Sequence, residues 1–286
     1  MKRPARAYDG QVGFAVGTGR CGTHFLAALM RTEPGVASAH ERNRLNEAFE
    51  RYCRWYQLPV DQEGFLFTKE QEIWNDLKQH RYSFEASAYL SQSLPALYQR
   101  FGARFVVLVR DPLRFVESCL QKGRGRNEIL WYERPYVLRD PSLAPGYQAA
   151  SLPNHFFGRI APAGERFWQW NAMTRVGKLG WFWAAVNGSI LTLLRQIPES
   201  HWRICPIESL DFPAYQALAA FLGVDSSLRA QDFSALLRRA RGTRARKPAG
   251  TAWAKTEVRE FEQEVAAVAE TFGYEWRWKR IAGGAG

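Results

Sequence analysis

A glycine-rich segment near the start of the chain has the residue types of an anion-binding loop. It reads GTGRCGTH over residues 17–24 and follows a short apolar run at 12–16. A loop of this kind between a strand and a helix directs backbone amides and the helix N-terminus at an anion. Arg20 is the only Lys or Arg within it. The segment therefore predicts a phosphate-binding turn, with a plain glycine turn as the alternative.

The same segment matches a P-loop only in part. Gly17 and Gly22 have the G-x-x-x-x-G spacing, after which the P-loop needs Lys and then Ser or Thr. Thr23 and His24 stand at those two positions. The match is incomplete where a γ-phosphate and a metal would be bound, so a P-loop kinase or NTPase remains only an alternative.

A second segment offers another arginine at the end of an expected strand. The apolar run RFVVLV at 104–109 predicts a buried strand, and Arg110 follows it directly. Its guanidinium fork suits a phosphate. Asp111 and Pro112 are the N-cap and first-turn residues of a helix start, and Ser118 lies about two turns further along. The alternative is a structural arginine beside a helix cap.

The elements expected around these loops alternate between strands and helices. Apolar patterning predicts strands at 12–16, 82–85, 104–109 and 202–207, and helices at 25–30, 42–56, 94–101, 112–121, 167–196, 215–222 and 253–272. We expect residues 238–247 to form a basic loop. Alternation predicts an α/β fold with a mainly parallel sheet, and ligands of such sheets bind at the carboxyl ends of the strands. Both loops are expected there.

Composition narrows the class of protein. The chain has 286 residues, 46% of them hydrophobic and 23% charged, which excludes a disordered chain, a collagen-like repeat and a coiled coil. Lys and Arg number 39 against 28 Asp and Glu, a net charge of +11. This favours an anionic partner: a nucleotide, a nucleic acid, a membrane surface or an acidic glycan.

We expect a single domain across residues 1–286, with a core at about 12–274 and a frayed tail at 283–286. Residues 123–164 contain five prolines and little periodicity, which is typical of a long functional excursion. We find no secretory signal and no spanning segment, and the four scattered cysteines indicate neither a zinc site nor a disulfide framework. A cytoplasmic setting is therefore expected.

GTGRCGTHFL resembles the 5′-phosphosulfate loop, G-x-x-R/K-S-G-T-T-x-L, of sulfotransferases that use 3′-phosphoadenosine 5′-phosphosulfate (PAPS). The resemblance implies that Arg20 contacts the transferring sulfuryl group. Cys21 and His24 depart from the family's Ser and Thr. Cys21 is either a small residue in a tight turn or, at a helix N-terminus, a thiol with a lowered pKa. The donor contacts implied here are Gly19, Arg20, Cys21, Gly22, Thr23 and His24.

VVLVRDPLRFVES resembles the family's 3′-phosphate motif, R-D-P-x-x-R-x-x-S, and every defining position is present. Arg110 and Ser118 are the implied phosphate contacts. In the family a late basic loop closes over the same phosphate, and three residues of this chain are candidates: Arg244, Arg246 and Lys247. The resemblance extends in order from Val12 to Tyr274 and implies the sulfotransferase fold, a P-loop-NTPase-like parallel sheet flanked by helices.

Sulfuryl transfer is an in-line displacement in which the acceptor loses a proton to a base. In carbohydrate and tyrosylprotein sulfotransferases that base is a Glu soon after the first helix, which by resemblance is Glu41, with His40 as the competitor. FEASAYLS at 84–91 resembles an acceptor-cleft segment of heparan-type sulfotransferases, so Glu85, Ser87 and Tyr89 are candidate acceptor contacts and Glu85 an alternative base. Ala86 replaces a family Lys there.

The resemblance therefore implies a PAPS-dependent sulfotransferase that needs no metal. It acts on a hydroxyl or amine of a glycan or small-molecule acceptor. A P-loop kinase or NTPase is the first alternative. A basic module that binds nucleic acid is the second, and it would show clustered cations interleaved with exposed aromatics. We do not expect a nucleic-acid partner.

Overall fold

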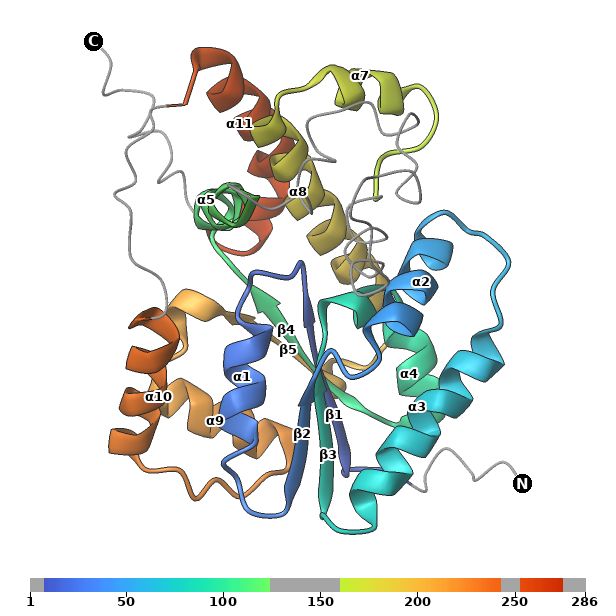
Figure 1. The fold of residues 1–286 in the computed structure, drawn as a ribbon, viewed down its shortest axis with the longest axis vertical. Coiled ribbons are helices and arrows are strands. Elements are labelled where there is room, and N and C mark those ends of the chain that lie inside the picture. Colours follow the sequence, from blue (N-terminus) through green and yellow to red (C-terminus); the bar gives the residue numbers. More distant parts are fainter. Residues whose placement is uncertain (1–7, 124–159, 243–252, 275–286) are drawn as a thin grey trace, which may run out of the picture.

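Five parallel strands form the central sheet of the computed structural model, which describes residues 8–123, 160–242 and 253–274 (Figure 1). Their order is β2-β3-β1-β4-β5, and every neighbouring pair is parallel. The strands are β1 (Val12–Gly17), β2 (Val36–His40), β3 (Tyr82–Ala86), β4 (Arg104–Val109) and β5 (Trp202–Pro206). The predicted α/β fold with a parallel sheet is confirmed.

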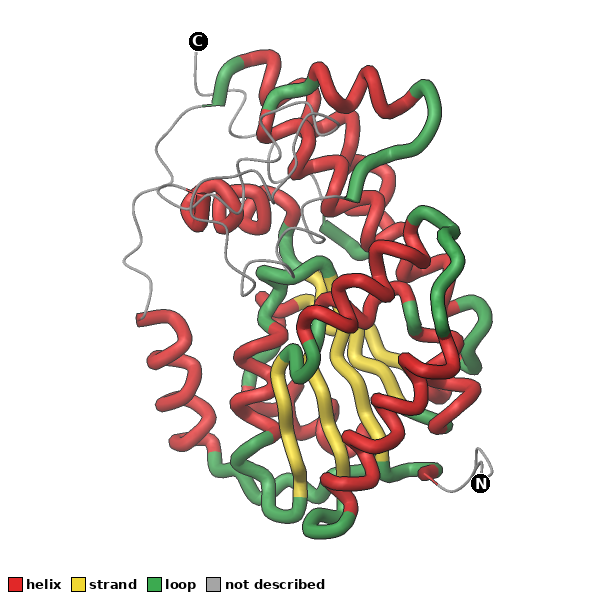
Figure 2. The backbone as a smooth tube through the Cα atoms, turned by 45° about the vertical axis from the view of Figure 1, so that its right-hand side comes forward, coloured by secondary structure: helices red, strands yellow, loops and turns green. Residues whose placement is uncertain are grey.

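Helices cover both faces of the sheet (Figure 2). The longer ones are α1 (Thr23–Met30), α2 (Arg44–Trp55), α3 (Gln62–Leu77), α4 (Leu94–Phe101), α5 (Pro112–Gly123), α7 (Arg166–Ala172), α8 (Arg175–Leu194), α9 (Phe212–Leu222), α10 (Ala230–Gly242) and α11 (Lys255–Thr271). Short 3₁₀ turns are η2 (Ala88–Gln92), η7 (Glu199–His201) and η8 (Ile207–Ser209).

The central strands β1 and β4 are almost wholly apolar because both of their faces are buried, whereas the edge strands β2 and β5 are only partly buried. Along β1, Phe14 and Val16 face a core built with α3, α4, α5, α8 and α11. Ala15 faces the opposite core, built with α1, α9 and α10. In Figure 1, α1, α9 and α10 lie on one side of the sheet and α3 and α4 on the other. The alternation fixes the register and leaves the strand ends to bear polar residues.

Two aspects of the fold differ from the sequence predictions. Strand β2 and helix α3 were not predicted, because VASAH has few strong strand formers and α3 mixes charged and apolar residues without a clear stripe. The predicted basic loop at 238–247 is wrong over its first part, since α10 continues to Gly242. Phe233, Leu236 and Leu237 pack against the α1 side of the core, which extends the helix into the basic segment.

Strand order brings the predicted loops together. Gly17, the last residue of β1, pairs with Leu108 of neighbouring β4, so the loops that follow these strands leave the sheet side by side. On the other side of β1, β3 pairs with β2, where His40 lies opposite Ala86. One edge of the sheet therefore presents the ends of β1, β2, β3 and β4 together.

Candidate functional site

The loop after β1 has the backbone of an anion-binding turn. Gly19, Arg20 and Gly22 all have positive φ, at 78°, 56° and 103°. A side chain at Gly22 would come within 2.5 Å of Ile207, so only glycine fits there. Cys21, between Arg20 and Gly22, does not have a positive φ. A change of handedness between neighbouring residues is how backbone N–H groups come to point toward one side in phosphate-binding nests. The turn leads directly into α1 at Thr23.

Cys21 lies inside this turn as a buried small residue. It is 0% exposed, and a Cβ on Gly17 would lie 2.5 Å from its sulfur. Burial raises the pKa of the Cys21 thiol to about 11, against the lowering effect of nearby hydrogen bonds. The alternative of a thiol with a lowered pKa is therefore wrong: exclusion from solvent outweighs the helix N-terminus here.

Arg20 and Ser118 join the two predicted loops directly. Arg20 donates from Nε and Nη2 to Ser118 Oγ at 3.2 and 2.9 Å, although 98 residues separate them. Arg110 donates from Nη1 to the backbone oxygen of Arg20 at 2.9 Å. Two guanidinium groups and a hydroxyl thus meet at the ends of β1 and β4. Burial lowers the pKa of Arg110, which indicates a cation that an anion would stabilise.

The turn after β4 is held by one contact that the sequence predicted and by three that it did not. Asp111 Oδ1 accepts from the Arg114 backbone N–H at 2.9 Å, which confirms the predicted helix cap. Glu208 Oε1 accepts from the Asp111 N–H at 3.1 Å, and Trp183 Nε1 donates to the Arg110 backbone oxygen at 2.8 Å. Tyr274 donates to the other oxygen of Glu208 at 2.9 Å. These long-range partners fix the direction in which Arg110 leaves the strand.

The end of β2 and the start of α1 together bring a carboxylate and two imidazoles to the same edge. Thr23 Oγ1 lies 3.1 Å from His40 Nε2, and the rings of His24 and His40 meet edge to face at 5.2 Å. Glu41 follows with a positive φ of 49°. Its carboxylate lies 3.9 Å from His40 Nε2 and 3.2 Å from Arg44 Nε. Glu41 and His40 therefore adjoin the first residue of α1.

His40 is held in its neutral form. Burial, together with the neighbouring His24 and Arg44, lowers its pKa to about 4. A group with a depressed pKa stabilises the fold above its unfolded pKa, near 6.5, and this stability is lost as the pH falls toward 4.

We expect this loss to be measurable. Between about pH 7 and pH 4, His40 makes the free energy of unfolding fall by up to about 3 kcal/mol. The free energy of unfolding is measured by urea denaturation at each pH. In a His40→Gln variant it is expected to depend less steeply on pH than in the wild-type protein. Equal slopes for the two proteins would contradict the assignment.

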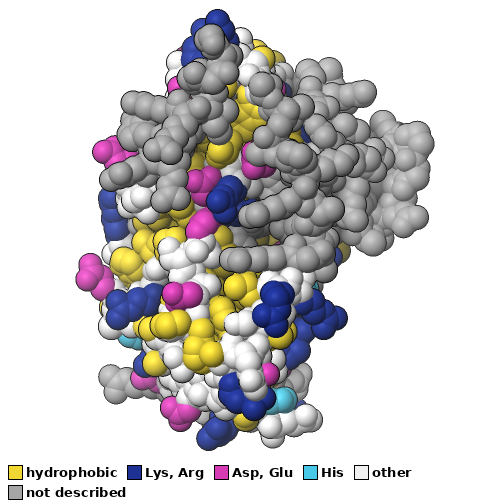
Figure 3. Space-filling model, turned by 90° about the vertical axis from the view of Figure 1, so that its left-hand side faces the viewer, with side chains coloured by type: hydrophobic (Ala, Val, Ile, Leu, Met, Phe, Trp, Pro, Cys, Tyr) yellow, Lys and Arg dark blue, Asp and Glu magenta, His cyan; other side chains and the backbone are white. Residues whose placement is uncertain are grey.

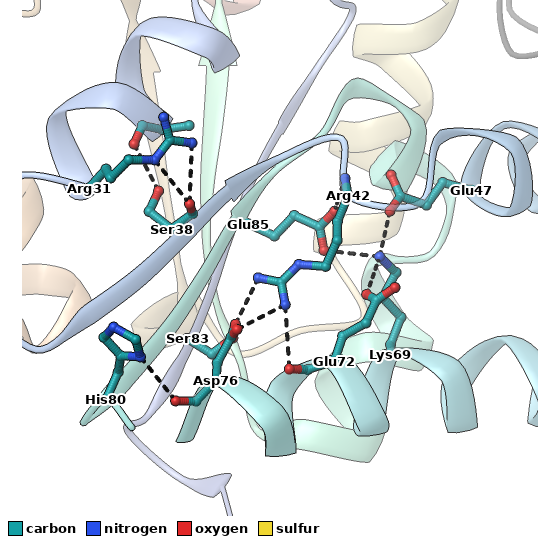
Figure 4. Close-up of polar contacts among 11 residues, drawn as sticks. Arg31, Ser38, Arg42, Glu47, Lys69, Glu72, Asp76, His80, Ser83 and Glu85 are labelled. Carbon is teal, nitrogen blue, oxygen red and sulfur yellow. Dashed lines mark hydrogen bonds and ion pairs between the residues drawn. The ribbon is translucent and has the colours of Figure 1, made fainter. Parts of the chain in front are cut away.

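Glu85 lies in a buried ionic cluster with Glu47, Lys69 and Glu72 (Figure 4), and Ser87 is buried beside it. Lys69 Nζ donates to Glu47, Glu72 and Glu85 at 2.5, 2.8 and 2.9 Å, and Ser87 Oγ donates to Glu47 at 2.6 Å. Burial and the Glu47 carboxylate raise the pKa of Glu85 to about 7, with Lys69 opposing them. The three carboxylates are close enough together to hold a cation, and the Lys69 ammonium already binds all three.

Of the remaining residues predicted to contact donor or acceptor, the structure describes only some. Tyr89 is buried, and burial together with the Glu41 charge raises the pKa of its hydroxyl. Arg244, Arg246 and Lys247 lie outside the described residues, as does nearly all of the excursion at 123–164. On the face seen in Figure 3, the described Lys and Arg side chains are dispersed among hydrophobic and acidic ones and do not form one stripe.

No family model matches the chain, and no curated protein matches it. The solved structures similar to this chain include three sulfotransferases. The sulfotransferase from Alicyclobacillus acidocaldarius is 13% identical, with 98% of this chain and 100% of that chain covered and a TM-score of 0.50. The sulfotransferase domain of the Synechococcus PCC 7002 olefin synthase is 16% identical, with 96% and 98% covered and a TM-score of 0.49. The sulfotransferase domain from the curacin biosynthetic pathway is 13% identical, with 93% and 98% covered and a TM-score of 0.46.

The likeness to the Alicyclobacillus enzyme, across nearly the whole of both chains, shows that this chain has the sulfotransferase fold. Within the part of the chain that the structure describes, none of the helices has the length and hydropathy of a membrane span.

Proposed function

We propose that the protein transfers the sulfuryl group of PAPS to a hydroxyl or amine of a small-molecule or glycan acceptor. The observation that supports this most is the junction of Arg20, Ser118 and Arg110 at the ends of β1 and β4. Two loops with separate anion-binding motifs meet there, as a donor with a 5′-phosphosulfate and a 3′-phosphate requires. The sulfotransferase fold is consistent with the same reaction.

In this proposal the loop after β1 binds the 5′-phosphosulfate. Backbone N–H groups of residues 19–24 face its oxygens, at the start of α1 where the helix dipole favours an anion. Arg20 neutralises the charge that develops on the leaving phosphate as the S–O bond breaks. Arg110 and Ser118 bind the 3′-phosphate, with Glu208 and Trp183 keeping the Arg110 backbone in place.

Glu41 is the proposed base. The acceptor oxygen or nitrogen forms a bond to sulfur, and its proton passes to the Glu41 carboxylate. The bond between sulfur and the bridging oxygen breaks at the same time, and its electron pair stays on the 5′-phosphate of adenosine 3′,5′-bisphosphate. His40 is less available for this role, because its Nε2 already lies 3.1 Å from Thr23 Oγ1.

The same site gives less support to the alternative function, a P-loop kinase or NTPase. Thr23 stands where a P-loop has its lysine, and its hydroxyl is occupied with His40 Nε2 at 3.1 Å. The chain therefore offers no ammonium group at the position that would contact a γ-phosphate. The Ser118 hydroxyl accepts a hydrogen bond from Arg20. This arrangement fits the 3′-phosphate of PAPS better than it fits the γ-phosphate of a nucleoside triphosphate.

The transfer itself is the test. The protein is incubated with PAPS labelled with ³⁵S in the sulfuryl group and with panels of hydroxylated metabolites, glycans and amines, with and without EDTA. We expect label on at least one acceptor, at a rate that EDTA does not change. Consumption of ATP with Mg²⁺, together with no consumption of PAPS, would contradict the proposal.

A further inference from the structure

The turn that bears Glu41 is held by three consecutive backbone hydrogen bonds. The N–H of Glu41 donates to the Ala86 backbone oxygen at 3.1 Å. The next N–H, of Arg42, donates to Glu85 Oε1 at 2.9 Å. The third, of Asn43, donates to Glu47 Oε1 at 3.1 Å. Two of these three acceptors are buried carboxylates and not backbone oxygens.

Such support is needed because the turn is strained. Glu41 has φ of 49°, a left-handed conformation that costs a non-glycine residue free energy unless the surroundings enforce it. Arg42, the residue after it, is fixed at its other end as well. Its guanidinium donates to both oxygens of Asp76, at 3.0 and 2.7 Å (Figure 4).

The two carboxylates would repel each other without Lys69. Glu47 and Glu85 are 0% and 4% exposed, and the Lys69 ammonium, itself 0% exposed, donates to both. Lys69 comes from α3, Glu47 from α2 and Glu85 from β3, so the cluster links three elements to one turn. Burial lowers the pKa of Lys69, but the charges of the carboxylates outweigh that effect and raise it overall, which keeps the ammonium charged.

We propose that Glu85, balanced by Lys69, is a positioning residue that holds the 41–43 turn so that the Glu41 carboxylate faces the donor loop. It acts through the Arg42 N–H and does not touch the acceptor. This inference rests on the proposed sulfuryl transfer with Glu41 as its base. It gives the buried cluster a role beyond stability, because the turn it grips contains the residue that must accept the proton.

The test replaces Glu85 by Gln, which keeps the shape of the side chain but leaves one acceptor oxygen for two donors. Glu85→Ala, which removes both oxygens, is the second variant. Glu33→Gln is the matched control. Glu33 is 3% exposed and binds Tyr215, Ser226 and Ser227, at 2.7, 2.6 and 2.8 Å, away from the turn.

Amide exchange, turnover and product affinity are measured in each protein. The first is hydrogen–deuterium exchange of the backbone amides in peptides covering residues 41–46. The second is hydrolysis of PAPS with water as acceptor, followed as release of adenosine 3′,5′-bisphosphate, with calorimetric affinity for that product. We expect faster exchange at Arg42 and a kcat lower by about 100-fold in both Glu85 variants, the size of loss that small misplacements cause. The KM for PAPS and the product affinity should stay at wild-type values.

The outcomes separate the two proposals. Glu33→Gln is expected to lower the melting temperature while it leaves kcat and the exchange at Arg42 unchanged. Wild-type kcat or unchanged exchange in Glu85→Gln overturns the positioning role, as does a parallel loss of product affinity. A wild-type protein that neither binds adenosine 3′,5′-bisphosphate nor hydrolyses PAPS would refute the proposed function instead, and the exchange data would still decide whether Glu85 holds the turn.

Discussion

Replacing Arg20 by Ala lowers sulfuryl transfer by about 100- to 1000-fold, the loss expected when one preorganised donor to a developing negative charge is removed. Arg20 is the only Lys or Arg in the loop at 17–24, so no neighbour there takes over its charge. Its side chain also loses both hydrogen bonds to Ser118. The measurement is kcat with labelled PAPS, beside the melting temperature as a check on folding.

A matched variant shows whether the loss of kcat is specific to Arg20 or follows the removal of any half-buried arginine. Arg104 lies at the other end of β4 and donates to the Phe221 backbone oxygen at 2.8 Å. Arg104→Ala is expected to lower the melting temperature and to leave kcat unchanged. Arg20→Lys keeps the charge but not the two hydrogen bonds to Ser118. Its kcat should therefore lie between the kcat of Arg20→Ala and that of Arg104→Ala. A fully active Arg20→Ala protein would remove Arg20 from the site.

Replacing Glu41 by Gln removes the proposed base without changing the size of the side chain. We expect kcat to fall by about 100- to 10,000-fold, the range that a general base supplies. Affinity for adenosine 3′,5′-bisphosphate should be unchanged, because the donor contacts proposed here come from β1–α1 and β4–α5. The turn itself persists, since its hydrogen bonds come from backbone N–H groups.

His40→Gln is the informative comparison for Glu41→Gln. It removes the contact with Thr23 and the competing base, and we expect a much smaller loss of kcat. Wild-type turnover in Glu41→Gln would contradict the assignment. The base would then have to be His40, or Glu85, which is buried with both oxygens engaged.

The parts of the fold that follow from local pattern were predictable from sequence. The run at 12–16 and FVVLV at 105–109 carry no polar side chain, because both faces of those strand segments are buried. Asp111 was predicted as a helix cap from its place before Pro112, and the Arg114 N–H confirms it. The carboxyl-end rule for parallel sheets then predicted that both loops lie at one edge, which the β1–β4 register confirms.

The parts that depend on distant partners were not predictable. Glu208 holds the Asp111 N–H from 97 residues away, and Trp183 holds the Arg110 backbone oxygen from 73 residues away. No spacing in the sequence indicates either contact. Lys69 and Glu72 have the i, i+3 spacing of an exposed helix pair, yet Lys69 is buried. One signal was present. Glu85 falls between apolar residues of a buried strand, and a carboxylate there requires a cation partner.

The central claim is that the β1 and β4 loops together bind a nucleotide with a 3′-phosphate, and calorimetric titration tests it most directly. The purified protein is titrated with adenosine 3′,5′-bisphosphate, and in parallel with ATP plus Mg²⁺. We expect the wild-type protein to bind the bisphosphate tightly, with an affinity that EDTA does not change. We expect Arg110→Ala to lose this binding and to keep the wild-type melting temperature. Binding of ATP with Mg²⁺ and not of the bisphosphate would contradict it and would make the first loop a divergent P-loop.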